Sequence, residues 1–305
     1  MDSGLTPQRG RGTPGPSTGR TGVRSAALAW SIAGFVVGGL LALVLCAPAS
    51  WLADALARLS QGRVLLLQAE GTVWSGQATL ALGSGPGGGP AVALPGRLLW
   101  SVRPQWLGRA LPELALELAH AQAMPEPIRI GISPTSAGWH IGLRRNPAGG
   151  ISQLQAPAAW LNGLGAPWNT LQPSGSLRVE VEDLQWTIGS DSRPKARMSM
   201  SVKLVNAASR VSTLPVLGHY ELAIRGGPEM NLVLSSGAGS ALQLEGMGLW
   251  TPGQALVFRG QALAASGRQE ALSNLLNIIG RREGDRSIIA LGQPVDSRPA
   301  SVPHQ

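Results

Sequence analysis

The chain has 305 residues and a net charge of +8, with 44% hydrophobic and only 14% charged residues. The basic residues are spread thinly, which argues against a nucleic-acid-binding protein, because such proteins carry a clustered basic patch. Cys46 is the only cysteine, so no intrachain disulfide can form and the fold must depend on its apolar core.

The N-terminal part of the chain holds a charged tail and an apolar segment. Residues 1–24 are rich in Gly, Pro, Ser, Thr and Arg, which predicts a disordered tail. Ala26–Leu45 contains no charge, and a helix of that length spans roughly 30 Å, the hydrocarbon thickness of a bilayer. Four arginines precede this segment and no Lys or Arg follows until Arg58. The positive-inside rule therefore predicts a cytoplasmic N-terminus, with the rest of the chain across the membrane.

Three other interpretations of the apolar segment compete with a signal anchor. A buried core helix is disfavoured, because such a helix is rarely apolar all round for twenty residues. Ala47-Pro48-Ala49 resembles a signal-peptide cleavage site, but the apolar run exceeds the roughly 7–15 residues of a signal peptide. A lipoprotein would need a small residue before Cys46, where Leu45 stands. We therefore predict an uncleaved anchor over residues 25–47. The residues predicted to make this anchor and its interfaces are Ala26, Trp30, Phe35, Leu40, Leu45 and Trp51.

The pattern after the anchor is first helical and then that of β-strands. Apolar residues recur at helical spacing from Trp51 to Leu59 and stop before Gly62, which predicts a short helix. From Val64 onward, short alternating or apolar runs are separated by Gly and Pro, which is typical of antiparallel sheets. The strands predicted here are Val64–Ala69, Ala78–Leu82, Arg97–Val102, Leu114–Ala119, Ile128–Ile132 and Trp139–Leu143.

The second part repeats this theme after a connection. Residues 147–173 are rich in Pro, Asn and Gly, with one helical turn predicted near Ala158–Leu161. Apolar alternation then slips by one residue near Asp183, which predicts a β-bulge. The later strands are predicted within Leu177–Ile188, Met198–Leu204, Tyr220–Ile224, Leu232–Leu234, Leu242–Leu244, Leu256–Phe258 and Ser287–Leu291.

Near the end, Leu272, Leu275, Leu276 and Ile279 predict an amphipathic helix capped by Gly280. Together the patterns predict a mainly β fold, with antiparallel and strongly curved sheet or sheets over residues 48–292. Residues 293–305 are predicted to be a disordered tail. A weak likeness between 70–78 and 245–255 is compatible with two similar halves that meet near 147–173, and with chance similarity in a chain rich in Gly, Ala and Leu.

Residues that could act in catalysis or bind a metal ion are sparse. The four histidines match no metal-ligand spacing, and neither a Gly-x-Ser-x-Gly elbow nor a phosphate-binding loop occurs. Glu180 and Glu182 share one face of a strand, so a solvent-exposed strand edge explains this acidic cluster better than a catalytic pair of carboxylates. We therefore predict that the protein is not an enzyme and has no cofactor, metal site or small-molecule substrate.

The tryptophan motifs are more informative than the ionisable residues. Gly71 and Gly76 flank Trp74, and glycine permits tight turns or close backbone approach. An indole covers a large apolar area and still offers its N–H to a partner, so each Trp is either a core anchor or an interface residue. The candidate structural or interaction residues are Gly71, Trp74, Gly76, Pro95, Gly96, Trp100 and Trp250.

The order of the short motifs is distinctive. Behind the anchor follow the segments Pro48–Leu52, Ala69–Gly76 (AEGTVWSG), Leu94–Trp100 (LPGRLLW), Gln172–Leu177, Phe258–Ala262 and Leu275–Gly280. This order resembles the type II secretion system protein N family over roughly residues 27–292. The resemblance implies a bitopic inner-membrane protein of Gram-negative bacteria with a periplasmic domain. Such a protein is an accessory, non-catalytic part of the machinery that exports folded proteins through the outer membrane.

Two classes of function remain open at this point. In the first, the domain offers strand edges and Trp-bearing surfaces to other secretion subunits, while the anchor binds inner-membrane lipids. In the second, the low charge and many apolar strands suit an AsmA-like periplasmic protein that binds or transfers lipids. A cell-wall hydrolase would need a clustered acid or metal site.

Overall fold

The computed structural model describes residues 21–106, 112–136, 138–145, 151–189 and 195–292, and within the first helix the side chains of Trp30 and of residues 32–45. The predicted tails at residues 1–20 and 293–305 lie outside these ranges. The chain divides into two compact units, residues 1–46 and 47–305.

In the first unit the described residues form the helix α1 (Thr21–Leu45), whose first four residues belong to the predicted tail of residues 1–24. Its described apolar side chains, which include Trp30, Phe35, Leu40 and Leu45, are exposed. The side chain of Ala26 lies outside the described ones. Within the part of the chain that the structure describes, no helix combines the length and the apolar character that crossing a membrane requires.

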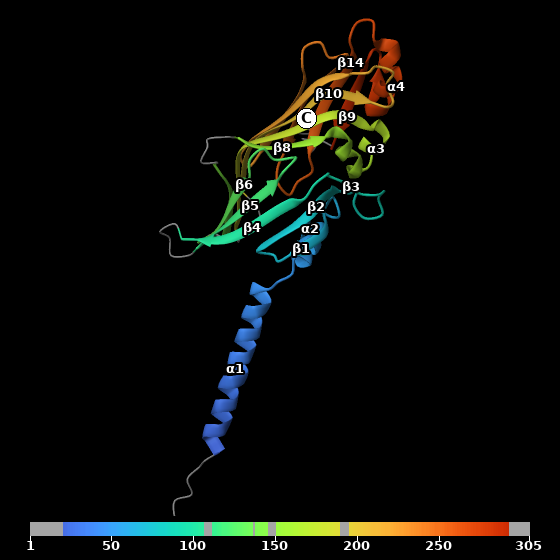
Figure 1. Ribbon diagram of the computed structural model, residues 1–305. Coiled ribbons are helices and arrows are strands. Elements are labelled where there is room, and N and C mark those ends of the chain that lie inside the picture. Colours follow the sequence, from blue (N-terminus) through green and yellow to red (C-terminus); the bar gives the residue numbers. More distant parts are fainter. Residues whose placement is uncertain (1–20, 107–111, 137, 146–150, 190–194, 293–305) are drawn as a thin grey trace, which may run out of the picture. The chain divides into compact units, whose positions relative to one another are not determined.

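The second unit is built on one antiparallel sheet, drawn in Figure 1. Its main path runs β1-β2-β4-β5-β6-β7-β9-β10-β11-β12-β13-β14-β16-β15, with β3 paired to β2 and β8 paired to β9. Mostly sequential hairpins produce this order, as the short turns predict. The strands are β1 (Val64–Gly71), β2 (Ser75–Leu82), β3 (Val92–Ala93), β4 (Leu98–Gln105), β5 (Glu113–His120), β6 (Ile128–Thr135), β7 (Gly138–Arg144), β8 (Ser152–Pro157), β9 (Pro173–Gly189), β10 (Lys195–Ser209), β11 (Gly218–Gly226), β12 (Met230–Ser236), β13 (Leu242–Trp250), β14 (Val257–Ala264), β15 (Arg281–Glu283) and β16 (Arg286–Leu291).

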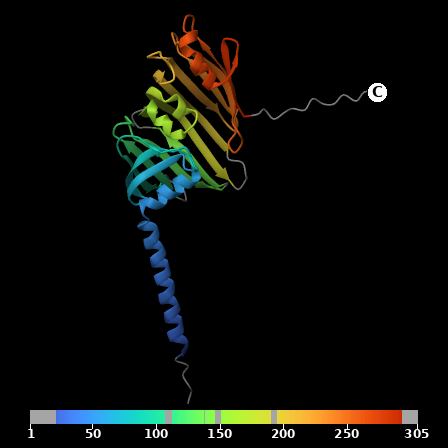
Figure 2. The same ribbon diagram turned by 90° about the vertical axis from the view of Figure 1, so that its right-hand side faces the viewer.

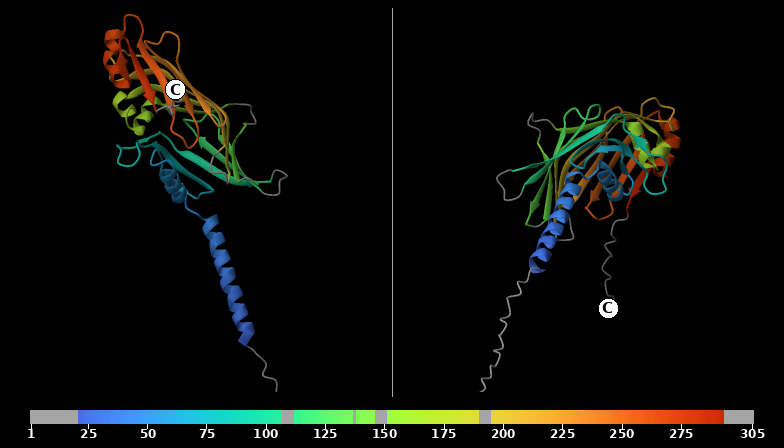
Figure 3. Two further views of the ribbon diagram at one scale, coloured as in Figure 1. Left: turned by 180° about the vertical axis from the view of Figure 1, so that it is seen from behind. Right: turned by 60° about the horizontal axis from the view of Figure 1, so that its bottom comes forward.

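The helices of this unit lie along one face of the sheet, which we call the inner face (Figure 2). They are α2 (Ala49–Leu59), the 3-10 helix η1 (Ala158–Leu164), α3 (Trp168–Leu171) and α4 (Gln269–Ile279). The sheet curves around them, and its ends β1 and β15 are not neighbours (Figure 3). The prediction of a mainly β, antiparallel fold is confirmed, and the sheet is open.

Three apolar clusters hold the inner face together, and each contains residues of one helical segment. Leu272, Leu275 and Leu276 of α4 pack with Tyr220 and Ala262. Trp160 of η1 packs with Leu82, Leu94 and Leu177 on the middle strands. Ala49 of α2 packs with Ala78 and Trp100 at the β1 end of the sheet. As the amphipathic periodicity of α2 and α4 predicts, each helix buries one apolar stripe against the sheet.

Several local predictions are confirmed in detail. The β9–β10 register shifts between the pairs Ser199–Asp183 and Met200–Val181, so the bulge holds Glu182, next to the predicted position. The predicted helical turn lies within η1. Gly280 does end α4, but in an extended conformation rather than a left-handed one. Glycine is required there because an added Cβ would lie 2.3 Å from the Ile288 carbonyl oxygen.

The segment 147–173 differs from the predicted plain connection, because it contains strand β8 along β9. The main sheet also runs past this segment without a break. The two similar sequence segments are not equivalent in register, since Glu70 pairs with Gln77 whereas Glu245 pairs with Gln261 rather than Gln254. The likeness between them therefore does not reflect two superposable hairpins.

Candidate functional site

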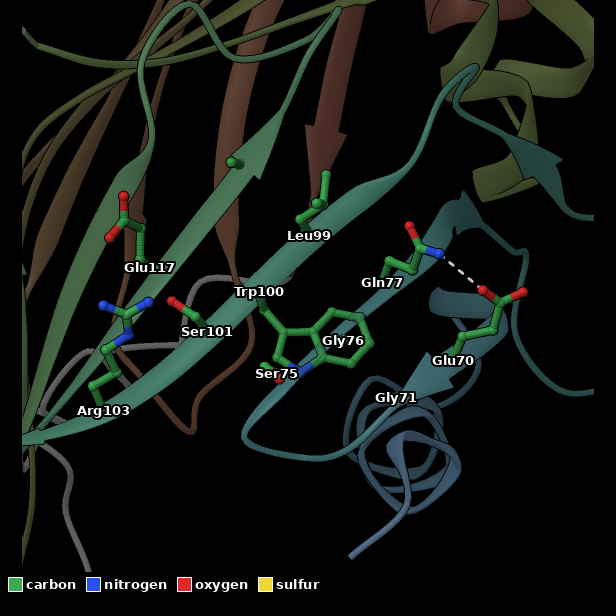
Figure 4. Close-up of a pocket in the computed structure, with 11 residues that line it drawn as sticks. Glu70, Gly71, Ser75, Gly76, Gln77, Leu99, Trp100, Ser101, Arg103 and Glu117 are labelled. Carbon is green, nitrogen blue, oxygen red and sulfur yellow. Dashed lines mark hydrogen bonds between the residues drawn. The ribbon is translucent and has the colours of Figure 1, made fainter. Parts of the chain in front are cut away.

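A shallow groove of about 690 Å³ lies at the β1 end of the sheet, over β1, β2, β4 and β5 (Figure 4). Gln77, Leu99 and Ser101 project into it from the face opposite α2, which we call the outer face, as the register of β2 and β4 requires. The residues that line the groove are Glu70, Gly71, Ser75, Gly76, Gln77, Leu99, Trp100, Ser101, Arg103, Glu117 and Ala119.

The floor of the groove depends on a contact between Gly76 and Trp100, which face each other across β2 and β4. A Cβ at Gly76 would lie 2.5 Å from Cζ2 of Trp100, so the indole occupies the space of the missing side chain. The indole Nε1–H of Trp100 donates to the carbonyl oxygens of Thr72 (3.1 Å) and Val73 (3.2 Å). With 4% exposure, Trp100 is a core anchor that fixes the β1–β2 turn.

The turn between β1 and β2 is closed by its own polar groups. The Thr72 N–H donates to the Ser75 carbonyl oxygen at 2.8 Å, and the Ser75 N–H donates to Thr72 Oγ1 at 3.1 Å. Gly71 has a φ of +92°, a conformation that favours glycine, and its Cβ would lie 2.6 Å from the Ser75 carbonyl oxygen. The motif around Trp74 therefore encodes a tight turn.

One end of the groove carries a network of charged and polar side chains. Gln77 Nε2 donates to Glu70 at 2.8 Å, and Arg97 forms an ion pair with Glu70 at 3.3 Å. Arg97 also donates to the carbonyl oxygen of Gln68, where a positive φ interrupts β1. The hydrogen bond from Gln77, with the Arg97 charge second, lowers the pKa of Glu70 below its ordinary value. Glu70 is therefore a fixed carboxylate at this end.

The other end of the groove carries Arg103 and Glu117, and Figure 4 shows both side chains beside Ser101. Glu117 forms a half-exposed ion pair with Arg129 at 3.5 Å. Between the two ends of the groove, Leu99 leaves 47% of its surface exposed. The groove thus combines a central apolar side chain with charges at both ends, a pattern common where protein surfaces meet.

The Pro95-Gly96 motif supports the groove from behind. Gly96 has a φ of +101°, and an added Cβ would lie 2.8 Å from Cε1 of His120. His120 is buried, and its Nδ1 accepts hydrogen bonds from the N–H groups of Gln122 (3.3 Å) and Ala123 (3.1 Å). Burial lowers the pKa of His120 below its ordinary value of 6.5. The imidazole is therefore a neutral structural group.

The remaining predicted site residues lie elsewhere. Of the motif residues, the structure brings Gly71, Gly76 and Trp100 together in the groove, while Pro95 is exposed on the turn before β4. Trp250 ends β13, opposite Met230, and does not line the groove. Trp74 bridges to β4, since its carbonyl oxygen accepts the Val102 N–H at 2.6 Å. Trp51 is exposed on α2.

Sequence reasoning missed the open-face residues Glu70, Gln77 and Leu99 of the groove, and Arg97, which pairs with Glu70. Each of them is adjacent in the sequence to a motif glycine or tryptophan, and adjacent residues of a strand point to opposite faces of the sheet. The period-2 alternation of strands could have placed them on one face. What the sequence lacks is the pairing of β1 with β2 and of β2 with β4, which joins residues 70 and 103 in one groove.

The groove presents an exposed Leu99 among charged and polar side chains, which suits recognition of another surface. Its serines, Ser75 and Ser101, have no histidine among the groove residues to act as a base. Among the described residues, no group of three His, Cys, Asp or Glu side chains could hold a metal ion.

Comparison with known proteins gives one match. A family model described as type II secretion system (T2SS), protein N, matches residues 62–289, which is most of the chain and nearly all of the sheet. The comparisons with curated proteins and with solved structures found no match. The family is a component of a secretion system, which supports an accessory role in type II secretion and an association with the cell envelope. The chain belongs to the type II secretion system protein N family.

Proposed function

We propose that this protein is a single-pass inner-membrane component of the type II secretion machinery, with its β-domain in the periplasm. In this proposal the segment Ala26–Leu45 is the anchor, the N-terminus is cytoplasmic and the outer-face groove contacts another secretion subunit. The observation that carries the proposal is the family match, which covers the whole groove and the strands that build it.

The membrane placement is supported by the sequence. Ala26–Leu45 contains no charged residue, and its flanking arginines lie on the N-terminal side. The described apolar side chains of α1 are also exposed, which suits contact with lipid better than contact with water. Two assays test this placement. The chain should stay in the membrane pellet at alkaline pH, and a phosphatase fused to its C-terminus should be active only if exported. A soluble chain or a cytosolic reporter would contradict it.

The groove is proposed as the contact site because it combines an exposed Leu99 with fixed charges at both ends. A partner would bury Leu99 and place opposite charges against Glu70 and Arg103. Leu99→Lys should abolish crosslinking to other secretion subunits in membranes and cause exported proteins to accumulate in the periplasm.

A matched control exists for this variant. Val233 lies in mid-strand on the outer face of β12 and has the same exposure as Leu99, 47%. Val233→Lys should leave both crosslinking and export unchanged. Loss in both variants would indicate a general defect of the sheet, and loss in neither would contradict a contact at the groove.

A second candidate function has one observation in its favour. Part of the inner face is apolar yet belongs to none of the three clusters, along the paired residues Ile132, Ile141 and Trp186. These side chains are only partly buried, and such a surface could hold acyl chains, as in an AsmA-like lipid-binding protein. Phospholipid that co-purifies with the chain, and is lost in Ile141→Asn, would favour this function over protein docking.

A further inference from the structure

A second, smaller cavity of about 190 Å³ lies where the loop after β2 meets η1 and α3. It is at the far end of β2 from the outer-face groove, and η1 contacts both β3 and α3 there (Figure 1). A water molecule occupies about 30 Å³ in the liquid, so the cavity has the volume of roughly six waters. This volume suits one sugar ring rather than a drug-sized ligand.

The walls of this cavity are held by close backbone contacts. Gly165, which follows η1, has a φ of +80°, and an added Cβ would lie 2.7 Å from Cβ of Ser84. Glycine is therefore required where the end of η1 approaches the loop after β2. On the other wall, Val92 of β3 pairs with Leu82 of β2. Because the backbone fixes its walls, the cavity is preformed, which lowers the entropy cost of binding a ligand.

Polar but uncharged side chains line this cavity. Among the described residues that line it none is charged, and the polar side chains belong to Ser84, Asn162, Asn169 and Gln172. Pro90 and Val92 add an apolar wall. A phosphate, carboxylate or ammonium group would enter without an opposite charge to meet it, which is costly. The lining therefore selects an uncharged ligand with hydrogen-bonding groups and some apolar surface.

Asn162 supplies an acceptor to this cavity. Its Oδ1 atom is buried and has no hydrogen-bond partner among the described residues. A buried polar atom without a partner costs free energy, and for that reason such atoms are few in folded proteins. An N–H or O–H group of a bound ligand would remove this cost.

Gln172 supplies a donor to the same cavity. Arg210 Nη1 donates to Gln172 Oε1 at 2.9 Å. Because a guanidinium group can only donate, the amide nitrogen Nε2 of Gln172 is the atom left for a ligand. Gln172 also has a φ of +44°, a conformation that glycine adopts with less strain. Strained residues of this kind cluster at ligand sites. The acceptor and the donor are thus both present at an energetic cost.

We propose that this cavity binds an N-acetylated amino sugar. The acetamido group of such a sugar has an N–H for Asn162 Oδ1, a carbonyl oxygen for Gln172 Nε2 and a methyl group for the apolar wall. The ring hydroxyl groups then meet Ser84 and Asn169. Glycan strands of the bacterial cell wall are built from these sugars, and this source rests on the periplasmic placement proposed above. Binding holds the β-domain at the cell wall and leaves the groove open.

Titration of the purified full chain tests the cavity, in a detergent such as lauryldimethylamine oxide that has no sugar headgroup. The probe is chitotetraose, a tetramer of N-acetylglucosamine, and the matched control is cellotetraose, which lacks the acetamido groups. Calorimetry should show binding of chitotetraose and about tenfold weaker binding of cellotetraose, because the amide hydrogen bonds are then lost. Equal binding of the two sugars, or binding of neither, would overturn the proposal.

Asn162→Leu separates binding from a structural role. The substitution removes the buried, unpartnered oxygen and keeps the size of the side chain. The unfolding temperature without sugar should therefore stay the same or rise, while chitotetraose binding weakens about tenfold. Gln172→Gly, which relieves the strained backbone, should likewise fold and bind weakly. Asn231→Leu, at an exposed position on β12, is the control and should bind normally. Unchanged binding in Asn162→Leu, or a lower unfolding temperature without sugar, would contradict the proposed role of Asn162.

Sedimentation identifies the source of the sugar. The chain should sediment with purified peptidoglycan sacculi, and free chitotetraose should release it. Binding to lipopolysaccharide but not to sacculi would overturn the assignment to the cell wall. A neutral peptide of glycine and alanine that binds where chitotetraose does not would identify a protein segment as the occupant and reject the sugar.

The failure of this site is distinguishable from the failure of the proposed function. The titration uses neither a membrane nor another secretion subunit, so a negative result leaves the anchor and the groove contact standing. Leu99→Lys, which should lose the subunit contact, should keep its affinity for chitotetraose. A cytosolic C-terminal reporter would reject the cell-wall source even where the titration shows binding.

Discussion

The two edges of the sheet are protected in different ways. β15 is only three residues long and reads Arg281-Arg282-Glu283, so it is short and charged. β1 has eight residues, with the apolar run Val64–Leu67, and carries no such charges in this run. Short or charged edges discourage pairing with other chains, and a long apolar edge invites it. By length and charge alone, β1 would be the edge that recruits a partner strand.

The hydrogen bonds of β1 show otherwise. Ser60 Oγ both donates to the Val64 carbonyl oxygen and accepts from the Val64 N–H, each at 3.1 Å. Because outward-pointing groups alternate along an antiparallel strand, Leu66 is the next residue whose N–H and C=O face outward. Gln68, with a φ of +51°, then interrupts the strand. Within Val64–Leu67 the open edge is thus reduced to one residue.

The C-terminal end of β4 is protected from strand pairing in a third way. The Val102 N–H points toward β2, where it reaches the Trp74 carbonyl oxygen, so residue 104 faces the same side. Residue 104 is proline, which has no N–H to donate. Strand addition, which the sequence suggested as a means of assembly, is therefore disfavoured at β1, β4 and β15. This leaves the outer-face groove as the proposed contact surface.

The largest expected effect comes from breaking the β1 end itself. Gly76→Ala would place a Cβ 2.5 Å from both the Glu70 carbonyl oxygen and Trp100 Cζ2. Because neither a paired backbone nor a buried indole can move easily, we expect a loss of about 2–4 kcal/mol in the free energy of unfolding. Urea denaturation of the full chain in detergent measures it. Gly227→Ala, where no heavy atom lies within 4 Å, should cost far less, and equal losses would contradict the Gly76–Trp100 contact.

A smaller effect should follow when the cap on β1 is removed. Ser60→Ala leaves the N–H and C=O of Val64 without their side-chain partner and should cost about 1 kcal/mol of stability. It should also open a second outward-facing residue, so self-association should rise in analytical ultracentrifugation. Ser273→Ala, which removes an exposed serine bond on α4, is the control for the loss of a hydroxyl. A Ser60→Ala chain that remains monodisperse would show that Gln68 alone protects the edge.

Acid should loosen the β1 end before the β15 end. The pKa of His120 is lowered in the fold, so above the ordinary value of 6.5 both the folded and the unfolded chain hold it neutral. As the pH falls below 6.5, the unfolded chain takes up a proton first, and the contribution of His120 to stability declines until the pH reaches its folded pKa. Hydrogen exchange should therefore show weaker protection of β4 and β5 in this window. His120→Gln should remove the effect, whereas His219→Gln, at an exposed position, should not.

The sequence predicted the elements better than their partners. Alternating residues located most strands, and even the bulge at Glu182 followed from a one-residue slip in apolar parity. β8 was missed because Pro, Asn and Gly around it dominate the composition, although Leu154 and Ala156 alternate with Gln153 and Gln155. Gly71, Gly76 and Trp100 were singled out for their types, but their meeting with Arg103 depends on strand pairing. Pairing is a long-range property that no local pattern contains.

The smallest effect on stability should come from the charged edge. Arg281→Thr with Arg282→Thr changes exposed side chains on β15, and the free energy of unfolding should stay within about 0.5 kcal/mol of the unchanged chain. Among the described residues, Arg281 forms an ion pair with its near neighbour Glu283 at 3.0 Å, and both side chains are well exposed, so this ion pair adds little stability. Self-association should nevertheless increase, because threonine favours strand pairing and the repulsive charges are gone. If charge protects β15 as hydrogen bonding protects β1, the Arg281→Thr, Arg282→Thr variant should self-associate without losing stability. Ser60→Ala, in contrast, should both self-associate and lose stability. A double variant that loses stability, or stays monodisperse, would show that the brevity of β15 is sufficient protection.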